Sequence, residues 1–316
     1  MKSFCFLITL CFTVSFNILA QDVDIKGEES FWRTGGEFNV TFQQVVLNNW
    51  AGGGKSSLAL GGVASTYLTY DDTTHRRWEN RLVVNYGISK IGDDNDRFIK
   101  TKDNLILTSR YGRKLSTHLY LSGLADFRSQ IAQGFKFIQL NDSVSDAQLV
   151  SEFMAPAFLV TSLGVTYSPR KRSLIEEDKK AQKQEENYFA LTLSPFSGKF
   201  TFVLNEDLVA NEQYNTEGKR VKAEAGSSLA LGINRKIWKN VIFNTNLNLF
   251  SAFEKFQNVD INLESLLILK VNKYIMSNIS LQLIYDDDIN VQRDDGTEGP
   301  AMQIQHAINV GFSYGF

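Results

Sequence analysis

Hydrophobic and polar residues alternate along the C-terminal end of the chain. From Met302 to Phe316 the even positions hold Met, Ile, His, Val, Phe or Tyr, and the odd positions hold Gln, Ala, Asn, Gly or Ser. Successive side chains of a strand point to opposite faces, so this segment has one apolar face and one small, polar face. A terminal aromatic residue, with Tyr314 and Phe312 on the same face, favours the closing strand of an outer-membrane barrel.

The same alternation recurs upstream and predicts an all-β fold, a transmembrane antiparallel up-and-down β-barrel of about twelve strands. Ten or fourteen strands are the alternatives, and a soluble two-sheet sandwich is the alternative architecture. The twelve predicted strands are Gly36–Val46, Ser57–Tyr70, Trp78–Ile91, Lys102–Tyr111, Thr117–Gln130, Phe153–Ser168, Tyr188–Pro195, one that begins near Val221, Val241–Phe253, Val259–Val271, Ile275–Tyr285 and Met302–Phe316.

The connections alternate between short and long, as barrel turns and surface loops do. Placing Phe316 at the periplasm predicts that the long segments Ile131–Glu152, Phe196–Arg220 and Asp286–Ala301 lie at the cell surface. Lys199–Leu204 has the composition of a short strand, but a thirteenth strand breaks the up-and-down order, so it is assigned to a loop. The charged run Arg170–Asn187 falls on the periplasmic side and is expected to be solvated.

The first twenty residues have the features of an export signal. Lys2 gives a positive start, Phe4–Phe16 is an apolar run, and Ala20-Gln21 is a suitable cleavage point. The predicted organisation is therefore a signal peptide (1–20), a short periplasmic segment (21–35) and a single barrel domain in the outer membrane of a Gram-negative bacterium (36–316). Both cysteines, Cys5 and Cys11, lie in the signal, so disulfides and cysteine chemistry are excluded from the mature chain.

Charged and amide side chains fall on the face that is polar in each strand, and we expect them to line the lumen. Their signs are mixed, so they either interlock as ion pairs that fill a narrow lumen or line a pathway that selects solutes by charge. The lumen candidates are Arg110, Asp126, Arg128, Asn244, Asn246, Asn248, Glu254, Asp260, Glu264 and Lys270.

Other residues are expected at the membrane interface, where aromatic side chains gather. These candidates are Trp50, His306, Tyr314 and Phe316. No paired metal-ligand spacing, phosphate-binding loop or nucleophile motif is present, so no catalytic residue, metal or cofactor is predicted. A lipid-modifying enzyme that uses His306 or His118 is a minor alternative.

The composition limits the kinds of binding partner that we expect. With 43% hydrophobic residues, 12% aromatic residues and a net charge of -2, the chain is neither disordered nor suited to general nucleic-acid binding. We expect contacts with outer-membrane lipid, with the barrel-insertion machinery through the C-terminal strand, and with a small solute, in a monomer. The predicted function is a narrow channel or binding barrel for small polar or charged solutes, and the alternative is a closed barrel that acts structurally or through its surface loops.

Several motifs are similar to those of a known family. They are Asn49-Trp50-Ala51 with Gly53 after Gln43, Trp78-Glu79-Asn80 with Leu82, Lys100–Leu105 followed by Arg110-Tyr111-Gly112, Ala155-Pro156-Ala157, Leu193-Ser194-Pro195, Ile284–Ile289 and the Gly311–Phe316 ending. Together they resemble a family of Bacteroidetes outer-membrane barrels, domain of unknown function 3078. The resemblance covers nearly all of the mature chain and implies a barrel without an established activity. The chain departs from the family at Arg170–Asn187, where a shorter connection is expected.

Overall fold

The computed structural model describes residues 31–45, 56–72, 74–91, 98–141, 144–169, 188–210, 214, 216–272, 274–293 and 297–315. The chain divides after Phe31, and the whole fold lies within Trp32–Phe316. The predicted signal peptide, Trp50, Phe316 and the charged run 170–187 lie outside the described residues. Among the described residues, no helix is long and apolar enough to cross a membrane.

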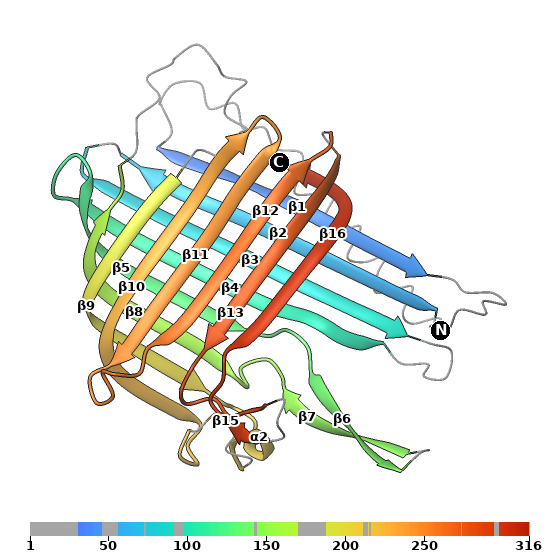
Figure 1. Ribbon diagram of the computed structural model, residues 1–316. Helices are drawn as coiled ribbons and strands as arrows, with labels where there is room; N and C mark the ends of the chain where they lie inside the picture. The colour runs from blue at the N-terminus through green and yellow to red at the C-terminus, as the bar shows by residue number, and fades with distance from the viewer. Residues whose placement is uncertain are drawn as a thin grey trace. The chain divides into compact units, whose positions relative to one another are not determined.

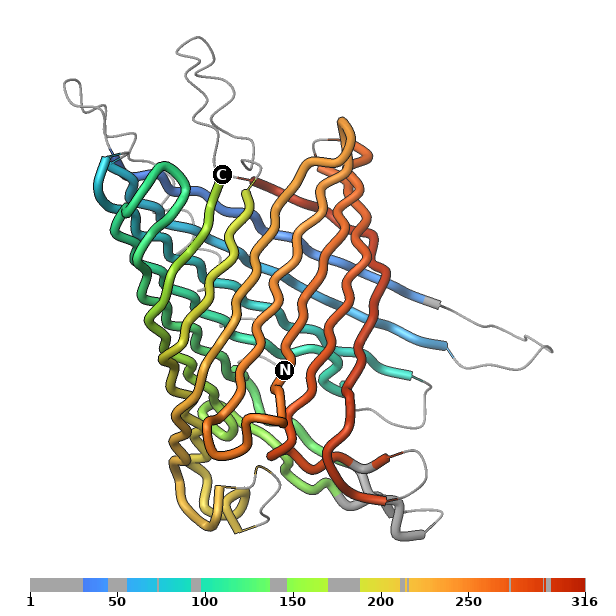
Figure 2. The backbone as a smooth tube through the Cα atoms, turned by 60° about the vertical axis from the view of Figure 1, so that its left-hand side comes forward, coloured from blue at the N-terminus to red at the C-terminus, as the bar shows by residue number. Residues whose placement is uncertain are grey.

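Twelve antiparallel strands close into a barrel, in the order β1-β16-β13-β12-β11-β10-β9-β8-β5-β4-β3-β2 (Figures 1 and 2). Closure gives each strand two neighbours, which removes the exposed edges of an open sheet. The strands are β1 (Trp32–Val45), β2 (Ser57–Asp71), β3 (Arg76–Ile91), β4 (Ile99–Lys114), β5 (Leu119–Ser129), β8 (Ala157–Tyr167), β9 (Tyr188–Phe202), β10 (Val221–Trp238), β11 (Val241–Ala252), β12 (Asp260–Lys270), β13 (Ile275–Tyr285) and β16 (Gln303–Gly315). The predicted fold class and strand number are confirmed.

One strand assignment is wrong. The chain from Phe196 to Phe202 does not belong to a surface loop, because β9 continues through Pro195 to Phe202. A β-bulge explains the error: Leu193 pairs with Val165 and Phe196 with Leu163, so Ser194 and Pro195 together face the single residue Gly164. Proline is tolerated at such a bulge because no ladder hydrogen bond is needed from its nitrogen. Lys199–Leu204 therefore adds no strand and extends an existing one.

The joint between the first and last strands is the shortest ladder of the barrel. β1 pairs with β16 only between Glu37–Thr41 and Gly311–Gly315, whereas its pairing with β2 runs from Trp32 to Val45. The two strands diverge beyond Thr41 (Figure 1). β1 also begins at Trp32 and not at the predicted Gly36.

The two ends of the barrel differ in their connections. At one end, called the turn end here, tight turns join β2 to β3, β4 to β5, β10 to β11 and β12 to β13. The last strand, β16, also ends there. At the other, the loop end, the segment between β5 and β8 forms a hairpin of β6 (Gly134–Asn141) and β7 (Val144–Ser151). A short helix, α2 (Glu206–Ala210), follows β9, and a small sheet of β14 (Val291–Gln292) and β15 (Glu298–Gly299) follows β13. The predicted loops therefore carry secondary structure.

A small apolar cluster packs among the loop-end connections. Ala155, Val203, Leu208 and Tyr214 are buried together, with Val209 and Ile289 against them. The Tyr214 hydroxyl donates a hydrogen bond to the carbonyl of Val150 at 2.8 Å. Burial raises the pKa of Tyr214 to about 12. The connections at this end are thus held together by a core of their own.

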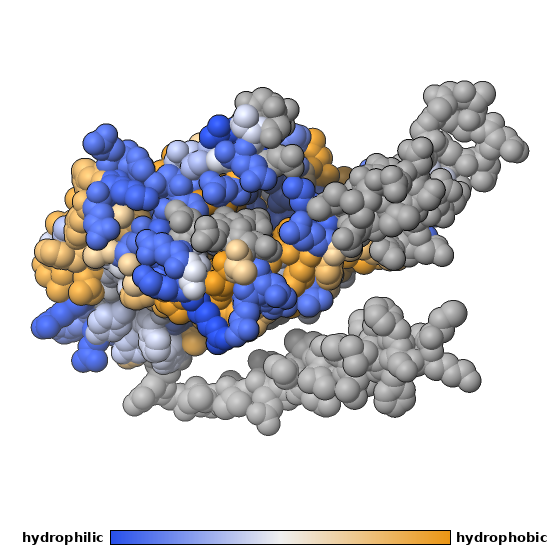
Figure 3. All heavy atoms as spheres, turned by 90° about the horizontal axis from the view of Figure 1, so that it is seen from below, coloured by the Kyte–Doolittle hydropathy of each residue, from blue (hydrophilic) through white to orange (hydrophobic). Residues whose placement is uncertain are grey.

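The barrel wall is apolar on its outside. Large hydrophobic side chains are exposed there, among them Leu163 (66%), Phe196 (70%), Ile308 (72%) and Phe312 (69%). Seen from the side of β6, β7 and α2, hydrophilic residues gather over the middle of the molecule and hydrophobic residues lie at its flanks (Figure 3). Small polar residues such as Ser162, Thr166, Thr192 and Ser194 are buried on the opposite, inner face.

Candidate functional site: the barrel lumen

The predicted lumen residues lie at different heights of the barrel. Arg110 lies on β4, Asp126 and Arg128 on β5, and Asp260 and Glu264 on β12. Asn246 and Asn248 of β11 face Glu264 and Asn262 across the ladder, and Asn244 lies on the same side of β11. Two candidates lie elsewhere: Glu254 follows the end of β11 at Ala252, and Lys270 is the exposed last residue of β12.

Arg128, the residue before the last of β5, bridges the lumen to β12. Its Nε donates to Asp126 Oδ1 at 2.6 Å on its own strand, and its Nη1 donates to Asn262 Oδ1 at 2.6 Å and Glu264 Oε1 at 3.0 Å. β5 and β12 are separated by β8, β9, β10 and β11 in the barrel order, so these bonds join opposite walls. The Arg128 side chain is only 16% exposed. Thr108 holds the other carboxylate oxygen of Asp126 at 2.8 Å, which fixes the base of the bridge.

A second contact crosses the lumen nearer the loop end. Gln305 of β16 donates to the backbone carbonyl of Thr101 on β4 at 3.2 Å. These strands are separated by β1, β2 and β3. A side chain therefore reaches across the lumen in two places, to other side chains at Arg128 and to the backbone at Gln305.

At the loop end, Lys199 is the centre of an ion-pair network. Its Nζ lies 2.6 Å from Asp260 Oδ2 and 2.6 Å from Asp286 Oδ2, and the residue is 5% exposed. The ring of Phe250 lies 6.0 Å from the same nitrogen, a cation–π distance. A buried ammonium needs such partners, because an unpaired charge in this surrounding is costly.

The network continues through Asp288. Lys222 Nζ lies 2.5 Å from Asp288 Oδ2, and Lys255 Nζ lies 3.2 Å from its Oδ1. Burial raises the pKa of Asp288, but the hydrogen bonds from Lys222 and Lys255 outweigh burial and leave its pKa below its usual range. The hydrogen bond with Asp288 raises the pKa of Lys255. Asp288 therefore links Lys222, which lies on β10, to Lys255, which lies in the connection after β11.

Three carboxylates in this network lie close enough to hold a cation. Single oxygens of Asp260, Asp286 and Asp287 lie within 4.8 Å of one another. Lys199 already places its ammonium 2.6 Å from two of them, so the positive charge at this point comes from the chain itself. Asp287 is also engaged by Asn258 at 2.6 Å.

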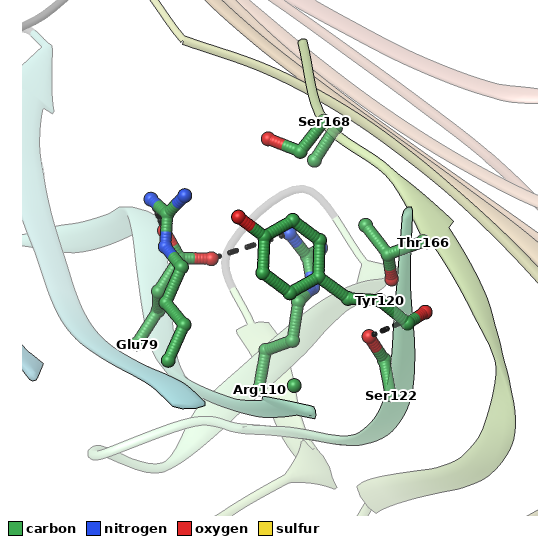
Figure 4. A pocket seen from close by; sticks show the side chains of 9 residues that line it. Glu79, Arg110, Tyr120, Ser122, Thr166 and Ser168 are labelled. Atoms are coloured by element: carbon green, nitrogen blue, oxygen red, sulfur yellow. Dashed lines mark hydrogen bonds and ion pairs between the residues drawn. The ribbon is translucent and has the colours of Figure 1, made fainter. Parts of the chain in front are cut away.

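At the turn end, two arginines share one carboxylate. Arg77 Nη2 donates to Glu79 Oε1, and Arg110 Nη1 lies 3.6 Å from Glu79 Oε2. Arg110 also donates to the hydroxyl of Tyr188 on β9 at 3.2 Å. The labelled side chains of Figure 4 show Glu79 and Arg110 facing Tyr120 and Ser122 of β5 across a pocket.

The interface candidates that the structure describes are both on the outer face. His306 and Tyr314 are exposed on β16, alternating with polar inward residues. His118 lies in the turn before β5, whereas His306 lies near the loop-end start of β16, so the fold does not bring these two histidines together.

Several residues of the lumen networks were not among the predicted lumen candidates: Asn262, Lys222, Asp286, Asp288, Lys199, Arg77 and Glu79. Lys199 was missed because its segment was assigned to a loop. Arg77 and Glu79 were missed, although their alternation with the exposed Trp78 is the signal of an inward-facing pair.

The family comparison concerns the first part of the barrel. The model of a family described as Protein of unknown function (DUF3078) matches residues 42–135, which is less than half of the chain. The predicted family resemblance is confirmed over this segment. It contains Arg77, Glu79, Arg110, Asp126 and Arg128, so one side of the lumen network lies within the matched residues. No curated protein matches the chain.

Several solved structures are similar in fold. The translocator domain of the autotransporter NalP from Neisseria meningitidis is 8% identical with a TM-score of 0.36, covering 97% of this chain and 95% of that chain. An outer membrane channel from Pseudomonas putida F1 is 11% identical with a TM-score of 0.38, covering 94% and 100%. The β domain of the Bordetella autotransporter BrkA is 12% identical with a TM-score of 0.31, covering 90% and 100%. At such identities and TM-scores these likenesses assign no activity to this chain.

Proposed function

We propose that this chain is an outer-membrane β-barrel whose lumen is a narrow, gated passage for small charged solutes. The apolar outer wall supports the membrane setting, because a closed barrel satisfies its backbone hydrogen bonds internally and can expose hydrophobic side chains to lipid. The exposed fractions of Ile308 (72%) and Phe312 (69%) are what a lipid-facing strand requires. The inner wall, in contrast, carries most of the buried polar and charged side chains, together with one apolar cluster of Ile242, Ile268 and Met276.

The bridge from Arg128 to Glu264 and Asn262 is the observation that carries the gating proposal. It joins opposite walls at the height where a solute has to pass. Twelve strands enclose a bore between the filled eight-stranded barrels and the open porins, so a single arginine can close it. Passage then requires that the charged solute compete for these partners, which selects solutes by charge.

Conductance in planar lipid bilayers tests this function. Wild-type barrels are expected to open rarely, and Arg128→Ala is expected to raise the mean conductance several-fold because Asp126 and Glu264 lose the cation between them. Arg81→Ala is the control: it removes an arginine from the lumen side of β3 that pairs across the ladder with Thr108 but makes none of the bridge's own hydrogen bonds, and it should stay close to wild type.

A second function is favoured by the same interlocked side chains. If neither wild type nor Arg128→Ala conducts or takes up solute, the interlocked side chains fill the lumen permanently. The barrel then acts through its loop end. The apolar cluster around Leu208 and Tyr214 gives that end a fixed surface on which such a binding function could rest.

A further inference from the structure

A small pocket opens on the inner wall at the turn end of the barrel. It is bounded by five adjacent strands, β3, β4, β5, β8 and β9. Its enclosed space is about 10 Å³, room for about one water-sized group, and the larger space of about 270 Å³ includes the open solvent at its mouth. Its polar lining comes from the side chains of Arg77, Glu79, Arg110, Tyr120, Ser122 and Thr166 (Figure 4). None of these residues takes part in the Arg128 bridge or in the loop-end network.

Positive charge exceeds negative charge in this pocket. Its lining holds two guanidinium groups and one carboxylate, so the net formal charge is 2 − 1 = +1. The Arg77 side chain is 7% exposed and that of Arg110 is 12% exposed, against 22% for Glu79. Guanidinium groups this deeply buried usually have a full set of acceptors, because an unpaired charge in a low dielectric is costly.

Both arginines retain a donor without an acceptor. The Nε atoms of Arg77 and Arg110 are buried and have no hydrogen-bond partner among the residues that the structure describes. A buried unpaired donor is costly, and more so when it is charged. Two such donors beside one pocket point to an acceptor that the chain itself does not supply.

The rest of the lining is suited to the same acceptor. Tyr120, Ser122 and Thr166 line the same pocket as the two arginines, and a hydroxyl can donate as readily as it accepts. The Ser122 hydroxyl donates to the carbonyl of Tyr120 at 3.5 Å, and the Thr166 hydroxyl lies 2.8 Å from that of Thr192, which leaves each hydroxyl oxygen a further position for a ligand. Gly112 leaves room for this arrangement, since a Cβ there would lie 3.3 Å from Tyr120 Cβ and 3.4 Å from Ser122 Oγ. The pocket therefore combines fixed positive charge with neutral donors and small neighbours.

We propose that this pocket binds one oxyanion, the carboxylate or phosphate group of a small solute. A planar guanidinium matches the two oxygens of such a group in a bidentate fork, which a spherical anion does not exploit. The proposal names a ligand class for the passage proposed above and rests on it for access to the lumen. The anion arrives from the turn end, because the loop end carries an excess of carboxylates.

Equilibrium binding to the detergent-solubilised full barrel tests the site. Isothermal titration calorimetry in a zwitterionic buffer uses inorganic phosphate, acetate and glycerol phosphate as separate probes. Arg77→Gln is expected to weaken binding of phosphate at least about tenfold, because one charge-assisted hydrogen bond is lost. Arg81→Gln is the matched control on the same face of β3 and should bind within about twofold of wild type.

Tyr120→Phe provides a milder variant, which removes one hydroxyl and leaves all charges in place. It is expected to weaken phosphate binding by roughly three- to tenfold. Each variant is first checked for the heat-dependent gel shift of a folded barrel. Tighter binding of glycerol phosphate than of inorganic phosphate identifies the ligand as a group of a larger solute; equal binding identifies the free anion.

The proposal is overturned if wild type binds none of the three probes, or if folded Arg77→Gln and Arg110→Gln bind phosphate as tightly as wild type. This outcome is separate from the passage. If Arg77→Gln loses phosphate binding and Arg128→Ala does not conduct, the anion site is supported and the passage is refuted. If the Arg128→Ala barrel conducts but the wild-type barrel binds no phosphate, the passage is supported and the anion site is refuted.

Discussion

Two ion-pair networks of the lumen, one toward each end, use the same chemistry with opposite excess charge. At the loop end three lysines, Lys199, Lys222 and Lys255, meet five carboxylates, those of Glu224, Asp260, Asp286, Asp287 and Asp288, so the formal charge is 3 − 5 = −2. In the turn-end network, Arg77 and Arg110 share the carboxylate of Glu79, the one carboxylate that pairs with them among the described residues, which leaves 2 − 1 = +1. The Arg128 bridge lies between them.

This difference shows how charged side chains can both build and polarise a lumen. Each charge is paired, as burial requires, but the pairing is incomplete in opposite directions at the two ends. Low-dielectric walls focus the resulting field along the passage. In the proposed passage, a cation is expected at the loop-end network and an anion at the turn-end pocket, with the bridge between the two.

Removing one cation from each end should give the largest contrast. Lys199→Met leaves Asp260 and Asp286 without their ammonium partner and is expected to lower the free energy of unfolding by about 3 kcal/mol. Arg110→Met leaves Glu79 paired with Arg77 and should cost about 1 kcal/mol. Urea unfolding of barrels in lipid vesicles measures both values.

The matched control for this pair is Lys219→Met. Lys219 lies in the connection before β10, and its pair with Glu217 is exposed, so a change near zero is expected. Equal losses for Lys199→Met and Arg110→Met would contradict the view that the two ends differ in how their charges are shared.

Much of the barrel follows from the sequence because its determinant is local. Alternation fixes which side chains of a strand share a face, so the positions of Asp126, Arg128, Asp260 and Glu264 on the inner face could be predicted. Which of these side chains contact one another could not be predicted from the sequence. Arg128 and Glu264 are 136 positions apart, and their contact depends on the curvature and register of the closed barrel.

The errors have a local cause as well. A proline within an alternating segment predicts the end of a strand, so β9 was expected to end at Pro195. In the structure Pro195 lies in a bulge, and β9 continues to Phe202. Lys199 was therefore placed in a loop, although its side chain is more deeply buried than those of Lys222 and Lys255, the other lysines of the loop-end network. Short elements such as α2 lack the periodicity by which longer elements are recognised.

Alkali should loosen the loop end specifically. The pKa of buried Tyr214 is about 12 in the fold against 10.0 for a free tyrosine, so its contribution to stability is complete below pH 10 and is lost as the pH rises toward 12. At pH 11 the loss is about 1 kcal/mol. Protease accessibility of the α2 connection between pH 9 and 12 measures it, and Tyr214→Phe should flatten the profile. An unchanged profile in that variant would assign the effect to another group.

Acid should have a smaller effect on the turn end. Asp72 Oδ1 accepts backbone hydrogen bonds from Thr74 (3.1 Å), His75 (2.6 Å) and Arg76 (2.7 Å). Burial opposes these bonds, but they prevail and hold the pKa of Asp72 below 3.8, so its stabilisation is present above that pH and is lost as the pH falls through the lowered pKa. Asp72→Asn should lower the free energy of unfolding at pH 7 by about 0.5 kcal/mol, and the difference from wild type should shrink in acid. A difference that is independent of pH would contradict this assignment.

A charge exchange across the lumen tests the central claim, that a salt bridge between facing walls closes the barrel. The single variants Arg128→Glu and Glu264→Arg each place like charges together at the bridge, and both are expected to raise bilayer conductance several-fold. The double variant restores opposite charges on β5 and β12 and is expected to return the conductance close to the wild-type level. If the double variant conducts as much as the single variants, or if none differs from wild type, the bridge does not close the lumen.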